Sequence, residues 1–278
     1  MSQAGDAEPL VDLDAMASEV LAASAEARQI SPFSRNFPGF DLDAAYRVAA
    51  AVRHRRISRG ETPVGRKIGF TNKTIWAEYG VHAPIWGYMY DTTVRDVAPG
   101  DSFSLDGLQE PRIEPEIAFG LGRAPEPGMD EAQLLSCIDW VAHGFEIVQS
   151  IFPDWRFAAA DTVAGCGLHG AFLCGQRRTI RQEEKGRWLT DLAAFSATLQ
   201  CDGGPAIGGQ ASDVLGGPVT ALGHLVNLLA RDPANPPLGA GEIVTTGTVT
   251  RAMPIAPGET WRTTLEGIAL DGLAVRLV

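Results

Sequence analysis

Glu114 and Glu116 stand two positions apart in an apolar stretch of the chain, and this spacing limits how the stretch can fold. They belong to residues 112–119, which read Arg-Ile-Glu-Pro-Glu-Ile-Ala-Phe. Side chains two apart on a strand point to the same face, so the carboxylates would stand side by side, roughly 7 Å apart along the strand. Buried like charges this close together repel strongly. The face that carries them must therefore meet either water or a divalent cation.

Glu146 places a third carboxylate inside an apolar run, between Phe145 and Ile147. In a chain with 34 acidic residues, a Glu-x-Glu pair on a strand is ordinarily a solvated face, so that alternative stays open. Ile113 and Ile117 on the opposite face of the first segment weaken it, because they indicate a strand buried on both sides. Three carboxylates without a convincing His or Cys partner form an all-oxygen set, which suits Mg²⁺ or Mn²⁺ rather than zinc.

The cysteines indicate neither a disulfide framework nor a zinc site. Cys137, Cys166, Cys174 and Cys201 lack the spacing of paired-cysteine motifs, and in a chain of this size they are expected to be reduced core residues. Cys166, His169 and Cys174 together lack a fourth ligand, so we do not expect zinc.

The net charge and the length of the apolar runs limit which kinds of partner the protein can bind. A formal charge of −11 argues against nucleic acids and anionic membranes, which both need a basic surface. Apolar stretches are interrupted well before about 18 residues, and the N-terminus lacks the basic and then apolar pattern of a signal peptide. We therefore expect a cytoplasmic protein with neither nucleic-acid nor membrane partners.

The front of the chain has helical patterns. Residues 11–28 are alanine-rich with apolar side chains on one side, and Asp41 or Asp43 can cap a second helix that reaches about Arg56. Residues 30–35 between these helices are expected to form a loop because of their Pro and Ser content.

After Gly65 the pattern changes to short apolar runs divided by Gly, Pro and Asp, which indicates strands and turns. Further helices are expected only over residues 130–140 and 219–231. Helices first and mostly strands afterwards predict an α+β fold rather than a parallel α/β sheet.

Two local motifs predict turns. Residues 268–270 and 273–277 flank an Asp-Gly pair, which is a strong hairpin signal. Residues 165–170 match the pattern G-x-G-x-x-G, but residues 171–175 look like a short buried strand where a dinucleotide fingerprint needs a helix. We therefore expect a glycine-rich turn there rather than a nucleotide site.

Two polar residues remain open on pattern alone. Lys67 lies between Gly65 and Gly69, which let backbone approach a ligand closely, although a lone lysine is usually a surface residue. Asp161 can be a site carboxylate or a turn cap, and its spacing favours the cap.

A series of short motifs, taken in order, makes the chain resemble a known family. The motifs are GRKIGFTN at 65–72, GV at 80–81, PIWG at 84–87, PRIEPEIA at 111–118, EIV at 146–148, DTVA at 161–164, LGGP at 215–218 and TGT at 246–248. As an ordered set they resemble the 2-keto-4-pentenoate hydratase and 4-oxalocrotonate decarboxylase family of the fumarylacetoacetate hydrolase superfamily. The resemblance implies a mixed β-roll catalytic domain over residues 63–278 behind a helical region over residues 1–62, an Mg²⁺ or Mn²⁺ site, and a homo-oligomer.

The resemblance also implies roles for residues already singled out. By motif position, Glu114, Glu116 and Glu146 would be the metal ligands, and Lys67 would be the catalytic lysine. A 2-oxo or 2-hydroxy acid can chelate the ion through its carboxylate and C2 oxygen, and a nearby lysine can move the proton between enol and ketone. The residues that we expect to bind the substrate are Phe70, Ile85, Trp86, Arg112, Asp161 and Thr248.

The chain departs from the family pattern in two places. Hydratases of the family tend to carry an acidic residue just before the aromatic-Gly pair, where this chain has Ile85 before Trp86, a form closer to the decarboxylase branch. His82, three residues earlier, is a candidate to handle the water in its place, with an ordinary loop histidine as the alternative. Residues 164–166 read Ala-Gly-Cys where the family often has Ala-Asp-Asn.

The predicted activity is that of a hydratase, which converts a 2-hydroxy-2,4-dienoate to its 2-oxo-3-enoate tautomer and adds water to C4. An alternative is decarboxylation of a 4-oxalocrotonate-like diacid, whose distal carboxylate would need a cationic anchor such as Arg66, Arg112 or Arg156. A second alternative is hydrolysis of an acylpyruvate C–C bond, although no clear His-carboxylate pair is visible to activate water. The remaining alternative is a catalytically silent subunit that pairs with an active lyase.

Overall fold

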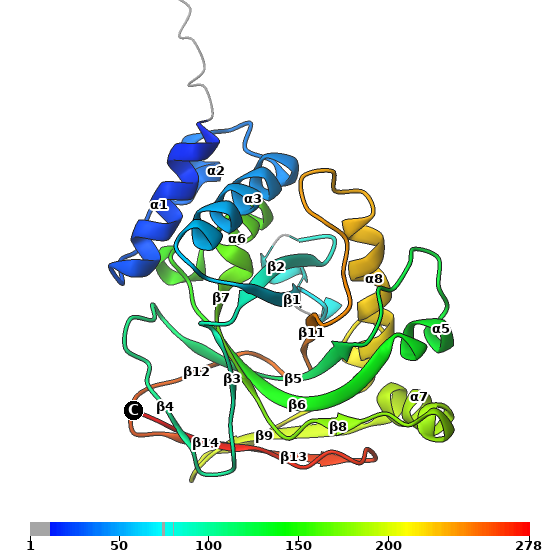
Figure 1. Ribbon diagram of the computed structural model, residues 1–278. Helices are drawn as coiled ribbons and strands as arrows, with labels where there is room; N and C mark the ends of the chain where they lie inside the picture. The colour runs from blue at the N-terminus through cyan, green and yellow to red at the C-terminus, as the bar shows by residue number, and fades with distance from the viewer. Residues whose placement is uncertain (1–11, 74–75, 80) are drawn as a thin grey trace, which may run out of the picture.

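The computed structural model (Figure 1) describes residues 12–73, 76–79 and 81–278. The N-terminal segment in which we expect no signal pattern, and Gly80 of the family-like motifs, lie outside the described residues. The chain folds into two mixed sheets with helices packed around them, which confirms the predicted α+β class.

The front helices occupy the segments that the sequence predicts. α1 (Leu13–Ala25) and α3 (Leu42–Ser58) are both present. The carboxylate of Asp41 caps α3, because it accepts a hydrogen bond from the Ala44 amide at 2.8 Å. The loop expected between them is wrong in part, since α2 (Phe33–Asn36) forms a short helix there and buries its first side chain in the core.

The later helices are all shorter than α1 and α3. They are α4 (Trp76–Tyr79), α5 (Glu131–Ser136), α6 (Ala159–Ala164), α7 (Lys185–Ala194) and α8 (Pro218–Leu229). The helix predicted over 130–140 ends early, because residues from Ile138 onward join a strand. α6 and α7 were not predicted, since α6 is only six residues long and α7 buries Trp188 and Leu192, an apolar pattern too sparse to read. None of the helices in the described ranges is long and apolar enough to cross a bilayer.

The larger sheet holds the strands that carry the three glutamates and Lys67. Its main path runs β2 (Ile85–Tyr90), β1 (Pro63–Gly69), β11 (Ile243–Thr248), β5 (Arg112–Leu121), β6 (Ile138–Val148), β7 (His169–Cys174) and β3 (Val94–Asp96), with β12 (Met253–Pro254) beside β5 and β8 (Arg178–Thr179) beside β6. β1 pairs parallel to β11, and β3 pairs parallel to β7, whereas the other pairings are antiparallel. The sheet is therefore mixed, as predicted for a β-roll.

A smaller sheet lies against the convex side of β5 and β6 (Figure 1). Its strands run β10 (Ala206–Gln210), β9 (Ser196–Cys201), β13 (Thr260–Glu266), β14 (Ala274–Leu277) and β4 (Ser102–Phe103). The hairpin predicted around the Asp-Gly pair is wrong in its pairing, because β14 pairs with β13 and residues 268–270 form no strand. A Cβ at Gly272 would lie 2.1 Å from the Thr263 carbonyl oxygen, so the connection passes tightly against β13.

The two faces of β5 have different surroundings. Ile113 packs in a cluster with residues of the smaller sheet, and Ile117 packs in a cluster with residues of α8. Glu114, Glu116 and Ala118 alternate with them and point to the other face, where Glu114 and Glu116 line a pocket and Ala118 packs in a separate cluster. This alternation confirms that the strand is buried on both sides.

The front helices are packed onto the rest of the chain rather than standing apart. Val20 of α1 and Val48 of α3 belong to one hydrophobic cluster with Phe152 and Val163 of α6 and its preceding loop. β1 begins at Pro63 directly after these helices. The division into a helical region and a catalytic domain between residues 62 and 63 stays a prediction.

Candidate metal centre and active site

The three glutamates converge because of strand register. Glu114 of β5 lies directly opposite Glu146 of β6, and Glu116 lies two residues further along the same face, opposite Gly144. Directly opposed residues on antiparallel strands have Cβ atoms about 5 Å apart. One carboxylate oxygen from each of the three glutamates lies within 4.8 Å of the others. Glu116 and Glu146 have no exposed surface, whereas Glu114 is half-buried.

Lys67 reaches this cluster from a strand that is not adjacent to it. Its ammonium nitrogen lies 3.1 Å from Glu146 Oε2 and donates a hydrogen bond to the Gly167 carbonyl oxygen at 2.9 Å. β1 is three positions from β6 in the sheet, which is about 14 Å in a flat arrangement. The contact therefore depends on the curl of the sheet. Gly167 has φ +66°, and a Cβ there would lie 3.1 Å from the Lys67 side chain, so the turn approaches the lysine closely.

His169 fixes the other oxygen of Glu146. The ring Nδ1 lies 2.8 Å from Glu146 Oε1, and Nε2 lies 3.0 Å from the Thr93 hydroxyl oxygen. Burial lowers the pKa of His169, so the ring is neutral and its Nδ1–H donates to the carboxylate. Glu146 is thus held between a histidine on one oxygen and Lys67 on the other.

Burial and charge set the protonation of the cluster. Burial raises the pKa of Glu114 to about 7 against the opposing charge of Lys67. Burial, with the charges of Glu146 and Glu114, raises the pKa of Glu116 well above its usual value. Burial also disfavours ionisation of Glu146, but Lys67 and His169 outweigh it and lower the pKa of that carboxyl. Burial opposes the charge on Lys67, yet the three carboxylates raise the pKa of its ammonium.

The oxygen atoms of the cluster fit a hard divalent cation. Glu116 Oε2 accepts a hydrogen bond from the Gly247 amide at 2.8 Å, whereas Glu116 Oε1 accepts none from the described residues. Glu146 Oε2 likewise accepts no hydrogen bond with satisfactory geometry within the described ranges, although Lys67 lies near it. Buried carboxylate oxygens without donors are costly unless a cation satisfies them. An all-oxygen set of this kind suits Mg²⁺ or Mn²⁺.

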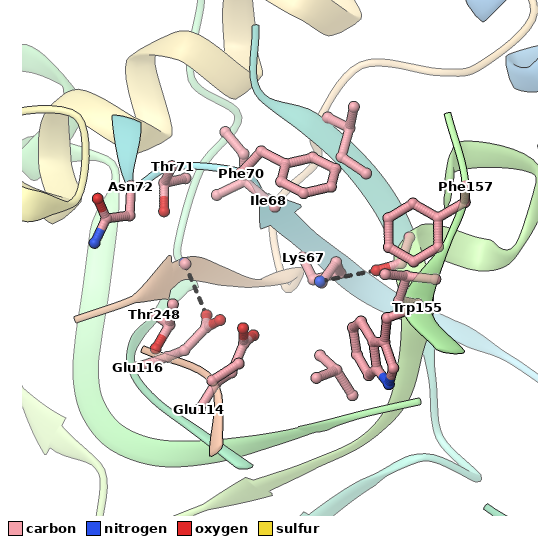
Figure 2. Close-up of a pocket in the computed structure, with 17 residues that line it drawn as sticks. Lys67, Ile68, Phe70, Thr71, Asn72, Glu114, Glu116, Trp155, Phe157 and Thr248 are labelled. Carbon is pink, nitrogen blue, oxygen red and sulfur yellow. Dashed lines mark hydrogen bonds between the residues drawn. The ribbon is translucent and has the colours of Figure 1, made fainter. Parts of the chain in front are cut away.

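A pocket opens beside the glutamates. Figure 2 shows Glu114, Glu116 and Thr248 on one side of it, Lys67 near the middle, and Trp155 and Phe157 across from them. The described residues that line it also include Ile68, Gly69, Phe70, Thr71, Asn72, Ile85, Val148, Gly167, Leu168, Gly247 and Ala252. The pocket therefore joins a charged end, where the carboxylates and the lysine meet, to an apolar end.

The structure brings most of the predicted site residues to this pocket. Lys67, Phe70, Ile85, Glu114 and Thr248 line it directly, as does Glu116. Arg112 lines an adjoining cavity together with Glu114 and Thr248. The Arg112 guanidinium also lies 4.0 Å from the centre of the Trp155 ring.

Three predicted residues lie elsewhere. Trp86 is buried and stacks on Tyr46 with ring centres 5.1 Å apart. Asp161 is buried at the start of α6, where its carboxylate accepts from the Ala158 amide at 2.8 Å and from the Ser34 amide at 2.9 Å. His82 is exposed and does not belong to the described lining of the pocket. Asp161 thus has the capping geometry that its spacing favours.

Sequence reasoning missed three residues of the site. Trp155 and Phe157 line the pocket from the loop after β6, and His169 holds Glu146. The loop carries a clear signal in its aromatic residues next to Pro153, but an aromatic loop is also typical of a core. His169 lies beside Glu146 only because β6 and β7 pair, which no local pattern indicates.

The sequence of the chain resembles those of known enzymes. No protein-family model matches the chain. A 2-hydroxyhexa-2,4-dienoate hydratase of Comamonas testosteroni is 32% identical over 243 residues, which cover 87% of this chain and 89% of the relative. The chain belongs to the 2-keto-4-pentenoate hydratase and 4-oxalocrotonate decarboxylase family. The resemblance read from the ordered motifs is thereby confirmed.

Solved structures extend this family assignment to the fold. The 4-oxalocrotonate decarboxylase from Pseudomonas putida G7, complexed with magnesium and adipate, has a TM-score of 0.86 and 27% identity, covering 96% of this chain and 97% of that one. The fumarylpyruvate hydrolase from Pseudomonas aeruginosa, in complex with Mn²⁺ and pyruvate, has a TM-score of 0.55 at 15% identity, covering 77% and 88%. The second likeness concerns the fold alone. The predicted fumarylacetoacetate hydrolase-type architecture is confirmed, while the roles of individual family residues in this chain stay predictions.

Proposed function

We propose that the chain is a divalent-metal-dependent hydratase, which converts a 2-hydroxy-2,4-dienoate and water into a 4-hydroxy-2-oxo acid. The observation that carries the proposal is the convergence of Glu114, Glu116 and Glu146 on one point, with Lys67 3.1 Å from Glu146. Membership of a family whose relatives include dienoate hydratases supports it.

We assign the cation site to the three glutamates, with Mg²⁺ or Mn²⁺ as the ion. Bound there, the ion would supply positive charge for the carboxylate and the C2 oxygen of a 2-hydroxy acid. Glu116 and Glu146 each turn one oxygen without a hydrogen-bond donor towards the cluster. The magnesium bound in the related 4-oxalocrotonate decarboxylase structure supports this choice of metal.

Lys67 is the residue that we assign to proton transfer. Its ammonium is held by the Gly167 carbonyl oxygen and by Glu146, and it faces the pocket (Figure 2). The neighbouring carboxylates raise the pKa of Lys67, so Nζ carries a proton that it can deliver to the substrate. The tautomerisation needs that proton at C5 as the C2 hydroxyl becomes a ketone.

The test is turnover of 2-hydroxypenta-2,4-dienoate by the purified protein with Mg²⁺. We expect loss of the diene absorbance and formation of 4-hydroxy-2-oxopentanoate. Lys67→Met should lower kcat by roughly 10²- to 10⁴-fold without weakening metal binding. Lys185→Met, a lysine on α7 outside the described pocket lining, is the matched control. Persistent diene absorbance in a protein that binds Mg²⁺ would refute the hydratase.

Decarboxylation of a 4-oxalocrotonate-like diacid is the second candidate. The likeness to a decarboxylase solved with a six-carbon diacid, together with Ile85 before the Trp-Gly pair, favours it. Of its possible anchors, Arg66 is buried and paired with Glu242, and Arg156 is exposed, whereas Arg112 lies beside the pocket. Release of CO₂ from the diacid, compared with hydration of the monoacid, decides between the two.

We also propose two properties that stay untested: that the protein is a homo-oligomer, which the family resemblance supports, and that it is cytoplasmic. Light scattering of the purified protein tests the first, and cell fractionation tests the second.

A further inference from the structure

The pocket has two chemically different ends. Among its described lining residues, the charged side chains are Glu114 and Glu116 at the reacting end and Lys67 near the middle of the pocket. At the other end Trp155 and Phe157 face the pocket (Figure 2), with further apolar lining from Phe70, Ile85, Val148 and Leu168. A 2-oxo acid whose carboxylate lies at the glutamates must therefore direct its tail to this aromatic end.

Trp155 is held in an uncommon backbone conformation. Asp154 and Trp155 have φ values of 58° and 56°, and Glu110 opposite them has φ 45°. Consecutive residues other than glycine rarely adopt the left-handed region, and such conformations persist only where the surroundings hold them. The loop that carries Trp155 is therefore held in place by its contacts.

Trp155 is held by contacts with Glu110 and with Arg112. The indole N–H of Trp155 donates to the Glu110 carbonyl oxygen at 3.1 Å, and the Asp154 amide donates to Glu110 Oε1 at 3.1 Å. The Arg112 guanidinium covers the ring at 4.0 Å. Arg112 lies two residues before Glu114 on β5, so the residue that orients the aromatic wall belongs to the strand that carries the proposed metal ligands.

We propose that Trp155, positioned by Glu110 and Arg112, is a specificity-determining residue that bounds a subsite for an uncharged alkyl tail and disfavours a terminal carboxylate. The inference rests on the proposed function, because it takes the glutamate end as the place of the 2-oxo acid group. A terminal carboxylate at this wall would lose water, and the nearest guanidinium, that of Arg112, lies against the Trp155 ring and outside the described lining of the pocket. An alkyl tail instead gains about fourfold in affinity for each methylene buried.

Two matched ligands test the subsite by binding alone. 2-Oxohexanoate and 2-oxoadipate share a six-carbon chain and the 2-oxo acid group, and they differ only in whether the far end is methyl or carboxylate. Neither has the double bond to which water would add, so the measurement does not depend on turnover. In the presence of Mg²⁺, titration calorimetry should give at least tenfold tighter binding of 2-oxohexanoate.

Variants of Trp155 and Glu110 test whether the preference for 2-oxohexanoate depends on the Trp155 side chain. Trp155→Ala should reduce the preference at least fivefold while the Mg²⁺-induced rise in Tm stays, and Trp155→Phe should keep most of it. Glu110→Ala should weaken the preference and Glu110→Gln should retain it, since glutamine keeps an acceptor for the Asp154 amide. Trp140→Ala is the control, because Trp140 also carries an arginine over its ring, Arg177 at 4.8 Å, but lies outside the described pocket lining.

The outcomes separate this inference from the proposed function. Equal or tighter binding of 2-oxoadipate by the wild type overturns the subsite, as does an unchanged preference in folded Trp155→Ala. If Trp155→Ala does not fold, two measurements still test the subsite. They are the ratio of the two ligand affinities in the wild type and the comparison of Glu110→Ala with Glu110→Gln. Preference for 2-oxohexanoate in a protein that hydrates no dienoate would leave the subsite standing and refute the hydratase.

Discussion

Changing Glu116 to glutamine tests the metal centre through stability, with no need for a substrate. Glu116 has no exposed surface, and one of its oxygens accepts no hydrogen bond from the described residues. Glutamine has nearly the same shape, can still accept from the Gly247 amide, and places an NH₂ group where a lone oxygen faced Glu114 and Glu146. The substitution therefore removes one negative charge and little else.

The size of the effect follows from the geometry. Two unit charges no more than 4.8 Å apart repel by at least about 3.5 kcal/mol at an effective dielectric constant of 20. The metal-free protein avoids part of this cost by protonation, because burial and the neighbouring carboxylates raise the pKa of Glu116. Stability from that bound proton is fully present below the unfolded pKa near 4.5 and is lost as pH rises towards the folded pKa, by about 1.4 kcal/mol per pH unit.

The variant lacks this loss, so without metal it should be more stable than the wild type above about pH 5. Its advantage should grow by roughly 3–5 °C in Tm for each pH unit, at 2–4 °C per kcal/mol for a chain of this size. With Mg²⁺ at about 100 times its Kd, the wild type should gain about 2.7 kcal/mol, or roughly 5–10 °C, and Glu116→Gln should gain little. Adding metal should thus reverse the order of the two Tm values.

Differential scanning calorimetry in EDTA and in Mg²⁺ at pH 6, 7 and 8 measures both effects. Glu183→Gln, an exposed glutamate far along the chain, is the control and should change neither the pH slope nor the metal response. The reasoning is refuted if Glu116→Gln is less stable than the wild type in EDTA at pH 8, or if it keeps the full metal-induced shift.

Three further predictions concern the same centre. His169→Gln should weaken Mg²⁺ binding by about 10- to 100-fold, because the histidine orients Glu146, while the exposed His54→Gln should not; calorimetric titration with metal measures this. Because the pKa of Glu114 is raised to about 7 in the metal-free protein, Mg²⁺ must displace a proton below that pH, and affinity should fall by up to about tenfold per pH unit; equal binding heats in buffers of different ionisation enthalpy at pH 6 would contradict this. Gly167→Ala should lower kcat and leave metal affinity unchanged, because a Cβ at φ +66° would press on Lys67 and cost about 1–2 kcal/mol in stability; steady-state kinetics beside a metal titration separate the two effects.

Local sequence patterns correctly predicted those helices and strands that depend only on neighbouring residues. Asp41 caps α3 as expected, and β5 is buried on both sides with Glu114 and Glu116 on one face. The helix expected beyond Ser136 was wrong, since Ile138 is drawn into pairing with β5. The helix or strand propensity of a few residues does not predict such strand pairing, because tertiary contacts override local propensity.

The hairpin predicted around Asp271 and Gly272 was also wrong because strand pairing is not a local property. An Asp-Gly pair is a turn signal for the residues on either side of it, yet β14 finds its partner in β13, beyond a longer connection. The choice of partner depends on which strands already border β13, and β9 occupies its other edge. That information is spread over more than 60 residues of the chain.

The sequence by itself determined the donor set of this protein: two carboxylates on one face of a strand, a third in a second apolar run, and an ordered set of motifs that names the family. Only the tertiary structure decided what surrounds that set. The curl of the sheet brings Lys67 across two intervening strands to Glu146, the pairing of β6 with β7 gives Glu146 its histidine, and the Glu110 contact places Trp155 over the pocket. The physical reason is that side-chain alternation is a property of each strand alone, whereas curvature and strand pairing arise from packing between segments far apart in the chain.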